Sequence, residues 1–265
     1  MSDDRATAGA AGDTVAPGTL YGVGVGPGDP ELMTVKAVKL LAAVPVIAYP
    51  APESGESSAR RIAACHIPQG RTEIAIRVPM RPGSVPSAPY DDGAAEIGRH
   101  LAAGRDVAVL CEGDPLFYGS FIYLHQRLLT RFGSEIIPGI SSLMACAAVA
   151  EKPLVARDDA LTVIPATLPD EALRGRLSQA NAAAIVKVGR HLPRLVGLCA
   201  ELGLVERATY VAHATRADQV VRPLCEYDPN EPAPYFSMLL IAAASQSGPE
   251  SVPVTHLKTG TETGS

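Results

Sequence analysis

The chain has 265 residues, of which 47% are hydrophobic and 19% are charged, and its formal net charge is −5 at pH 7. This length allows one large domain or two small ones, and the acidic balance argues against binding nucleic acid through a generally basic surface. No apolar run reaches the roughly 18 residues that a membrane-spanning helix requires, so we do not expect a transmembrane protein.

The two ends of the chain differ in composition from the rest. Residues 1–18 are rich in Ala, Gly, Asp and Thr and lack the basic and apolar segments of a signal peptide, which predicts a disordered lead-in. Residues 245–265 are rich in Ser, Thr, Gly and Pro, which predicts a flexible tail. The five scattered cysteines form no Cys-x-x-Cys pair, so they indicate small buried thiols, a reducing cytoplasm and no zinc site.

Between residues 19 and 152, strand-like and helix-like segments alternate. Such alternation is typical of a mainly parallel sheet that is covered by helices on both faces. The predicted strands are 20–25, 44–49 (closed by Pro50), 73–78, 106–110 and 135–137, and the predicted helices are 31–43, 58–66, 92–103, 121–132 and 141–150.

A second α/β domain is predicted from 153 to 244, after the break at Glu151-Lys152-Pro153. Its last three strands follow one another with little helix between them, which favours antiparallel pairing and therefore a mixed sheet. The predicted strands are 161–164, 184–188, 208–212, 220–226 and 235–243, and the predicted helices are 170–180 and 192–202.

The segment Cys-Glu-Gly-Asp-Pro-Leu-Phe-Tyr-Gly at 111–119 has the strongest ligand-binding character. It follows the apolar run 107–110, which we interpret as a buried parallel strand, and open α/β sheets bind small molecules at such strand ends. The turn has no Lys and no Gly-Lys-Ser/Thr, so it is not a phosphate loop. It offers backbone groups and one carboxylate, which suits a ligand with hydroxyls, an amine or a positive charge.

Four other small-residue turns also follow predicted strands. The glycine-rich segment 22–30 fails the Gly-x-Gly-x-x-Gly spacing of a dinucleotide site, and taken alone it is a tight strand-to-helix turn. Segment 138–142 lacks Gly-x-Ser-x-Gly, so we do not expect a hydrolase nucleophile there. Segments 186–190 and 210–216 complete the set. Five such turns, spread over two domains, indicate one ligand site.

Three of these segments resemble the tetrapyrrole methyltransferase family: Gly-x-Gly-Pro-Gly-Asp-Pro-Glu-Leu-Met-Thr-Val-Lys-Ala from Gly24 to Ala37, Glu-Gly-Asp-Pro-Leu-Phe-Tyr-Gly, and Pro-Gly-Ile-Ser-Ser. The resemblance covers about 19–243. Within the family, Cys111–Leu128, together with 161–167 and 186–190, is most similar to the precorrin-2 carbon-20 methyltransferases of cobalamin synthesis. The resemblance implies a homodimer of two α/β domains with a cofactor cleft between them. The implied reaction is S-adenosylmethionine-dependent methylation of precorrin-2 to precorrin-3A.

The resemblance also implies which residues hold S-adenosylmethionine, largely through backbone groups and without a metal. These are Pro27 in the first turn, Glu112, Gly113, Asp114 and Phe117 in the second, Ser141 and Ser142 in the third, Val188 in the fourth, and Ala214 and Thr215 in the fifth.

A general base has only to assist the loss of a pyrrole or meso-carbon proton. The candidates are Tyr49, Tyr118 and His213, and for His213 a satisfied histidine at a strand end is the simpler interpretation. Some relatives that methylate other ring carbons have an acidic residue where this chain has Tyr49, so their base has no counterpart here.

A polycarboxylate tetrapyrrole would need Arg and Lys side chains around it. The available ones near predicted loops are Arg60, Arg61, Arg77, Arg81, Arg157, Lys187, Arg190 and Arg216. Two alternatives remain open: the cobalt-loaded substrate of the anaerobic pathway or another ring position, and a non-catalytic tetrapyrrole-binding protein.

Overall fold

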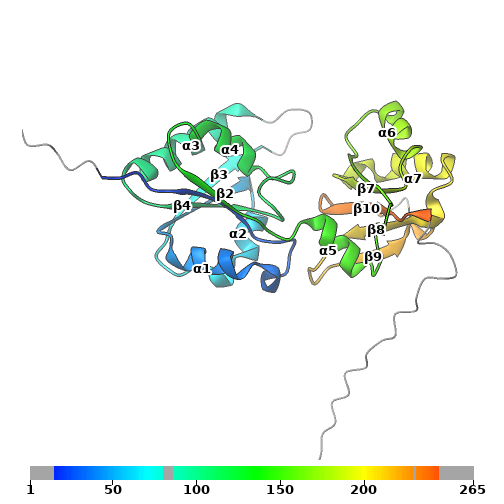
Figure 1. Cartoon of the computed structure of the whole chain (residues 1–265), viewed down its shortest axis with the longest axis horizontal. Helices are drawn as coiled ribbons and strands as arrows, with labels where there is room; N and C mark the ends of the chain where they lie inside the picture. Colours follow the sequence, from blue (N-terminus) through cyan, green and yellow to red (C-terminus); the bar gives the residue numbers. More distant parts are fainter. Residues whose placement is uncertain (1–14, 80–85, 229–230, 245–265) are drawn as a thin grey trace, which may run out of the picture. The chain divides into compact units, whose positions relative to one another are not determined.

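The computed structural model describes residues 15–79, 86–228 and 231–244, and the chain divides into two compact units between Ser142 and Leu143 (Figure 1). Most of the predicted lead-in, the whole predicted tail and Arg81 therefore lie outside the described residues. Gly18, at the end of the predicted lead-in, is held by the sheet unit, because its N–H donates to the Leu101 carbonyl at 2.8 Å.

Helix α5 (Ser142–Val149) begins where the two units meet in the sequence. Its Leu143, Ala145 and Cys146 are buried. The break at Glu151-Lys152-Pro153, which suggested a boundary between 152 and 153, follows the end of this helix. The predicted domain limits and the compact units therefore differ by about the length of α5.

Unit 1 contains an all-parallel sheet, as predicted. Its order is β3-β2-β4-β1-β5, and every adjacent pair is parallel. The strands are β1 (Leu20–Gly24), β2 (Val46–Pro52), β3 (Thr72–Val78), β4 (Val107–Cys111) and β5 (Ser134–Ile137).

Helices cover both faces of this sheet (Figure 1). On one face, α3 (Ser87–Ala102) and α4 (Phe121–Leu128) pack over Val107 and Val109. On the other, α1 (Val35–Ala43) and α2 (Ser58–Ile62) pack over Ala108 and Leu110. All of β4 is buried because alternate residues of a central parallel strand face two helical layers.

The chain changes direction between β1 and β4, which lie side by side. After β1 it crosses to β2 on the far side of β4, whereas after β4 it crosses to β5 on the far side of β1. Loops at such a switch point leave in opposite directions and open a crevice at the carboxyl ends of the strands, where ligands of open α/β sheets bind. Gly24 and Cys111, which end these strands, are register partners.

Unit 2 contains a mixed sheet in the order β6-β7-β10-β8-β9. Only β6 and β7 pair in parallel, and the late strands pair antiparallel, as predicted. The strands are β6 (Leu161–Pro165), β7 (Ala182–Val186), β8 (Ala208–Ala212), β9 (Val220–Pro223) and β10 (Ser237–Ile241).

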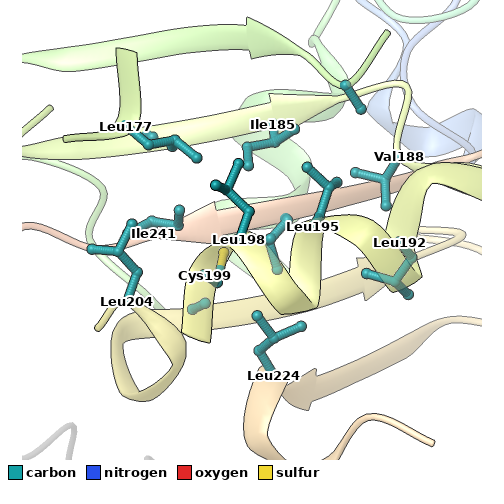
Figure 2. Packing of buried hydrophobic residues seen from close by; sticks show 14 of the residues in the cluster. Leu177, Ile185, Val188, Leu192, Leu195, Leu198, Cys199, Leu204, Leu224 and Ile241 are labelled. Atoms are coloured by element: carbon teal, nitrogen blue, oxygen red, sulfur yellow. The ribbon is translucent and has the colours of Figure 1, made fainter. Parts of the chain in front are cut away.

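The core of unit 2 lies between this sheet and two helices, α6 (Asp170–Leu177) and α7 (Leu192–Glu201). Figure 2 shows Leu195 and Leu198 of α7 pointing toward Ile185 of β7. Burying aliphatic side chains of this size stabilises a fold by about 1.5–3 kcal/mol each. The apolar residues of α7 thus fix the helix over the strands whose turns carry predicted site residues.

The two predicted strand ends that differ most from the structure both involve proline. Strand β9 ends at Pro223, and Leu224–Glu226 form a 3-10 turn instead of continuing the strand. Strand β2 runs through Pro50 to Pro52 rather than ending before it. Strand β4 pairs with β2 only as far as Ala48, so beyond that point one side of β2 has no ladder bond for a proline to remove.

No helix among the described residues is both long enough and apolar enough to cross a membrane.

Candidate functional site

Three of the five predicted turns come together in unit 1, at the carboxyl ends of β1, β4 and β5. Their closest approach is made by Gly24, Gly113 and Gly139, which we name the glycine cluster. A Cβ on Gly24 would lie 2.6 Å from the Gly113 carbonyl oxygen, and a Cβ on Gly139 would lie 2.1 Å from the same atom. No side chain fits at either position, so the three turns meet backbone against backbone.

Hydrogen bonds hold the first two turns together. The Gly113 N–H donates to the Gly26 carbonyl at 2.8 Å, and the Val25 N–H donates to the Cys111 carbonyl at 2.9 Å. Gly26 (φ 78°) and Gly113 (φ 64°) have left-handed backbones, which glycine adopts without steric cost. Glycine is therefore required by backbone geometry at positions 26 and 113.

The carboxylate of Asp114 connects the second turn to the third. Its Oδ1 accepts the Leu116 N–H at 2.9 Å, and its Oδ2 accepts the Gly139 N–H at 3.1 Å. We expected this carboxylate to bind a ligand, but both of its oxygens already accept backbone N–H groups. Asp114 stabilises the shape of the glycine cluster, and any contact with a ligand would come in addition to this role.

Apolar side chains lie beside the glycine cluster. Leu116 is 53% exposed, Tyr118 is 49% exposed with a left-handed backbone (φ 58°), and Ile140 is partly exposed. The rings of Phe117 and Tyr118 meet edge to face, with centroids 5.1 Å apart. Large exposed apolar residues next to a strand-end turn, one of them in a strained conformation, are typical of a ligand-contacting surface.

The other predicted cofactor residues of unit 1 are accessible to different degrees. Pro27, Glu112 and Ser141 are half-buried, and Ser142, the first residue of α5, is exposed. The structure brings the turns that carry Pro27, Gly113 and Ser141 to one edge of one sheet.

In unit 2, the fourth and fifth turns follow β7 and β8. The side chains of Val188 and Ala214 are buried, so these residues can offer a ligand only backbone groups. Lys187 (φ 59°), His213 (φ 50°) and Thr215 (φ 67°) all have left-handed backbones. The Gly189 N–H donates to Ser237 Oγ at 3.1 Å, which ties the fourth turn to β10.

The same unit contains a pocket of about 250 Å³. Its apolar lining includes Leu192 and Ala212, and its polar lining includes His213, Tyr210 and the ion pair of Arg222 with Glu231. Mostly apolar pockets with a few placed polar groups are the usual form of small-molecule sites.

The three candidate bases have different surroundings. The Tyr49 hydroxyl donates to Glu73 Oε2 at 2.8 Å, and Arg60 binds the same carboxylate with two N–H groups at 2.8 and 2.9 Å. Burial and then this hydrogen bond raise the pKa of Tyr49 above its ordinary value of 10.0, so it stays protonated and suits a base poorly. Tyr118 is exposed. Nδ1 of His213 lies 2.6 Å from Asp218 Oδ2.

Sequence reasoning missed Glu73, Asp218 and Ser237. Glu73 reaches Tyr49 because β3 lies next to β2, and the sequence does not specify strand order. Asp218 reaches His213 only through the irregular turn between β8 and β9. No spacing rule marks any of these pairs.

Several of the proposed substrate cations already have partners in unit 1. Arg60 binds Glu73, Arg61 contacts Ser58, and Arg77 donates to the carbonyls of Pro52 and Gly55. In unit 2, Lys187, Arg190 and Arg216 lie on the fourth and fifth turns, and the Arg216 guanidinium stacks 4.4 Å from the Phe236 ring centroid. Arg157 lies on an exposed loop.

The five thiols of the chain are free, and three of them are buried. Burial raises the pKa of Cys111 and of Cys146 to about 12 and that of Cys199 to about 11, so these thiols stay neutral. Cys65 and Cys225 are exposed, and none of the five is in a disulfide. No group of three or more His, Cys, Asp or Glu side chains among the described residues could hold a metal ion.

Comparison with known proteins adds direct relatives. Residues 19–226 match the model of the family described as tetrapyrrole (corrin/porphyrin) methylases. The chain is 41% identical over 240 residues to the precorrin-2 C(20)-methyltransferase of Sinorhizobium sp., covering 86% of this chain and 96% of that protein. It is 32% identical over 227 residues to the cobalt-precorrin-2 C(20)-methyltransferase of Salmonella typhimurium, covering 84% and 96%.

A longer relative and a solved structure complete the comparison. The chain is 43% identical over 235 residues to the cobalamin biosynthesis protein CobIJ of Mycobacterium tuberculosis, covering 85% of this chain but only 46% of CobIJ, so it spans about half that protein's length. The uroporphyrin-III C-methyl transferase of Thermus thermophilus, solved with S-adenosyl homocysteine, has the same fold. Its TM-score is 0.61 at 23% identity, over 85% of this chain and 92% of that one.

Proposed function

Because the chain belongs to the tetrapyrrole (corrin/porphyrin) methylase family, we propose that it methylates precorrin-2 at carbon 20, with S-adenosylmethionine as the methyl donor, to give precorrin-3A in cobalamin synthesis. The observation that carries this proposal is the 41% identity to the Sinorhizobium enzyme over 96% of that enzyme's length. A match of this extent covers both units of the chain.

The backbone of unit 1 fits S-adenosylmethionine. The glycine cluster keeps side chains out of the switch-point crevice, which leaves backbone groups to contact a ligand that carries both an amine and a carboxylate. We propose the contacts that the sequence predicted: Pro27, Glu112, Gly113, Asp114, Phe117, Ser141, Ser142, Val188, Ala214 and Thr215. When bound, the cofactor supplies a methyl group on a sulfonium.

The chain's own contribution is orientation and exclusion of water. Turns braced by Asp114 and by the hydrogen bond from Gly113 to Gly26 hold their shape before any ligand arrives. Aligning two reactants can remove about 7–11 kcal/mol from a barrier. The apolar side chains of Leu116, Phe117 and Tyr118 would exclude water from the reacting atoms and contact the flat apolar face of a macrocycle.

The substrate's carboxylates require cations, and we propose Lys187, Arg190 and Arg216 for this role. All three lie on the fourth and fifth turns, next to the proposed cofactor residues of unit 2. Arg60 is a weaker candidate because its guanidinium already binds both oxygens of Glu73. Guanidinium groups pair well with carboxylates even in a protein of net negative charge.

The second candidate function is methylation of cobalt-precorrin-2 in place of precorrin-2. It is supported by the 32% identity to the Salmonella enzyme. Parallel assays decide between the two. Purified protein is incubated with methyl-labelled S-adenosylmethionine and either metal-free precorrin-2 or its cobalt complex, and the product is identified by mass spectrometry. We expect a single labelled methyl group on the metal-free substrate, at a higher kcat/KM than on the cobalt complex.

Failure of both substrates to become labelled would contradict the proposed activity. Titration calorimetry with S-adenosylhomocysteine then separates the remaining explanations. Binding without turnover would indicate another ring position or another tetrapyrrole, whereas no binding would favour a non-catalytic tetrapyrrole-binding protein.

We also propose that the protein acts as a homodimer in the cytoplasm. The free cysteines of the described chain support a reducing compartment, and the family resemblance supports a dimer. Light scattering of the purified protein should give twice the chain mass of 27.6 kDa, and a mass of one chain would contradict the dimer.

A further inference from the structure

A histidine–aspartate pair lies directly after β8. His213 is the first residue beyond the strand, and its Nδ1 lies 2.6 Å from Oδ2 of Asp218. The His213 side chain is 23% exposed, whereas that of Asp218 is 67% exposed. The ring is therefore enclosed on most sides, while the carboxylate reaches it from the solvent side.

The backbone around this pair is fixed by four hydrogen bonds. His213 donates its N–H to the Phe236 carbonyl at 2.9 Å, and its own carbonyl accepts the Arg216 N–H at 3.0 Å. The Thr215 N–H donates to Gln219 Oε1 at 2.7 Å, and the Gln219 N–H donates to the Arg216 carbonyl at 3.1 Å. We name residues 213–219 the histidine turn.

Two residues of the histidine turn have backbones that side chains disfavour. His213 has φ 50° and Thr215 has φ 67°, and a β-branched residue such as Thr is rarely found there. Strained residues of this kind persist where the surrounding structure holds them, and they cluster at functional sites.

The pairing determines which ring nitrogen can react. A carboxylate at Nδ1 favours the tautomer with the proton on Nδ1, so Nε2 keeps its lone pair and can accept a proton. His213 also lines the 250 Å³ pocket of unit 2, together with Tyr210, Tyr227 and the Arg222–Glu231 pair. A small group that enters this pocket therefore lies against His213.

We propose that Nε2 of His213 accepts the proton that the methylated carbon loses, and that Asp218 is its positioning residue. This inference rests on the proposed function. The meso carbon forms its new carbon–carbon bond with its own electron pair, while the carbon–sulfur pair stays on sulfur as a neutral thioether. The macrocycle is then a cation. It becomes neutral when the same carbon gives its hydrogen to Nε2 as a proton, and the C–H electron pair returns to the conjugated system.

The main test replaces His213 by asparagine, because Asn tolerates left-handed backbone better than other side chains and the turn should still fold. We expect kcat for precorrin-2 to fall at least about 100-fold, as removal of a general base typically does. The affinity for S-adenosylhomocysteine and the thermal midpoint should stay close to those of the wild type. Added imidazole should restore part of the lost kcat. His66→Asn, which changes a histidine outside the five turns, is the matched control.

The positioning role is tested with Asp218→Asn, which keeps the shape of the side chain but removes the charge that fixes the tautomer. We expect a fall of about tenfold or more in kcat with KM unchanged, since orienting carboxylates act on the chemical step. Asp218→Glu should recover part of the loss. If Asp218 had only a structural role, Asp218→Asn would lower the thermal midpoint and would not lower kcat selectively over KM.

The outcomes separate the two proposals. If the wild-type protein leaves precorrin-2 unmethylated, the proposed function fails and the role of His213 fails with it. If the wild type is active and folded His213→Asn keeps its kcat within about threefold, only the role of His213 is overturned. A loss of kcat that imidazole does not restore, accompanied by a lower thermal midpoint, would also overturn it in favour of a structural role.

Discussion

The two sets of strand-end turns differ in what they offer a ligand. In unit 1, the three turns meet through Gly24, Gly113 and Gly139, and the Asp114 carboxylate is used to brace the backbone. In unit 2, the turns hold Lys187, His213 and Thr215 in left-handed conformations, as the second turn of unit 1 holds Tyr118. We therefore expect the turns of unit 1 to contact a ligand through backbone shape, and those of unit 2 through charged or proton-accepting side chains.

The largest expected effect comes from adding one methyl group to the glycine cluster. In Gly139→Ala the new Cβ would lie 2.1 Å from the Gly113 carbonyl oxygen, so the turns must separate. We expect a loss of about 3 kcal/mol in the free energy of unfolding and undetectable binding of S-adenosylhomocysteine. Gly133→Ala is the control, because a Cβ there meets nothing within 4 Å. Chemical denaturation and calorimetry measure both effects, and normal binding by Gly139→Ala would contradict recognition by backbone shape.

Asp114→Asn should have the next largest effect. An amide can accept only one of the two backbone N–H groups that the carboxylate binds, and its NH₂ faces the other as a second donor. We expect about 2 kcal/mol of destabilisation and roughly tenfold weaker binding of S-adenosylhomocysteine. The exposed Asp158 provides the control variant Asp158→Asn. If binding weakens without any loss of stability, the carboxylate acts on the ligand and not as a brace.

A glycine of unit 2 should behave in the opposite way. Gly175 lies within α6, and a Cβ at this position meets nothing within 4 Å. Gly175→Ala should stabilise the protein by about 0.5–1 kcal/mol, because alanine loses less backbone freedom in a helix. Thermal and urea unfolding measure this gain. A destabilised variant would mean that the two units do not differ in how they use glycine.

The smallest effect concerns the carboxylate shared by Tyr49 and Arg60. The hydrogen bond from Arg60 lowers the pKa of Glu73 below its ordinary value of 4.5. The ion pair therefore adds its full contribution to the free energy of unfolding above pH 4.5, and this contribution is lost as the pH falls through the pKa of the folded state. Because the pair is partly exposed, we expect only about 0.5 kcal/mol. Glu73→Gln should lower stability at pH 7 and flatten its dependence on pH below 4.5. Equal acid sensitivity in the two proteins would show that the ion pair contributes nothing.

The sequence predicted unit 1 and its turns well because backbone requirements leave a visible pattern. Apolar runs such as 107–110 indicate buried strands. Glycines that the backbone requires stand directly after these strands in the sequence, so they indicate where the turns lie. The fourth and fifth turns were found only by their position at strand ends. Their important contacts, such as that between His213 and Asp218, depend on an irregular turn whose path no periodic pattern encodes.

The order of the strands in the sheet is the second feature that the sequence did not predict. The three turns of unit 1 meet because β1 lies between β4 and β5, and Tyr49 meets Glu73 because β2 lies beside β3. The alternation of strands and helices predicts a parallel sheet but leaves many orders possible. Pro50 led to a wrong prediction of the end of β2. A proline is tolerated there because β4 no longer pairs with β2 beyond Ala48.

Buried thiols in each unit become accessible to reagents only when that unit unfolds. Cys111 lies at the end of β4 in unit 1, and Cys199 lies in α7 within the core of unit 2. In the native protein an alkylating reagent should reach only Cys65 and Cys225. Pulsed alkylation in rising denaturant, read peptide by peptide, would therefore record when each sheet opens. The two curves would reveal whether the units melt as one cooperative body or one after the other.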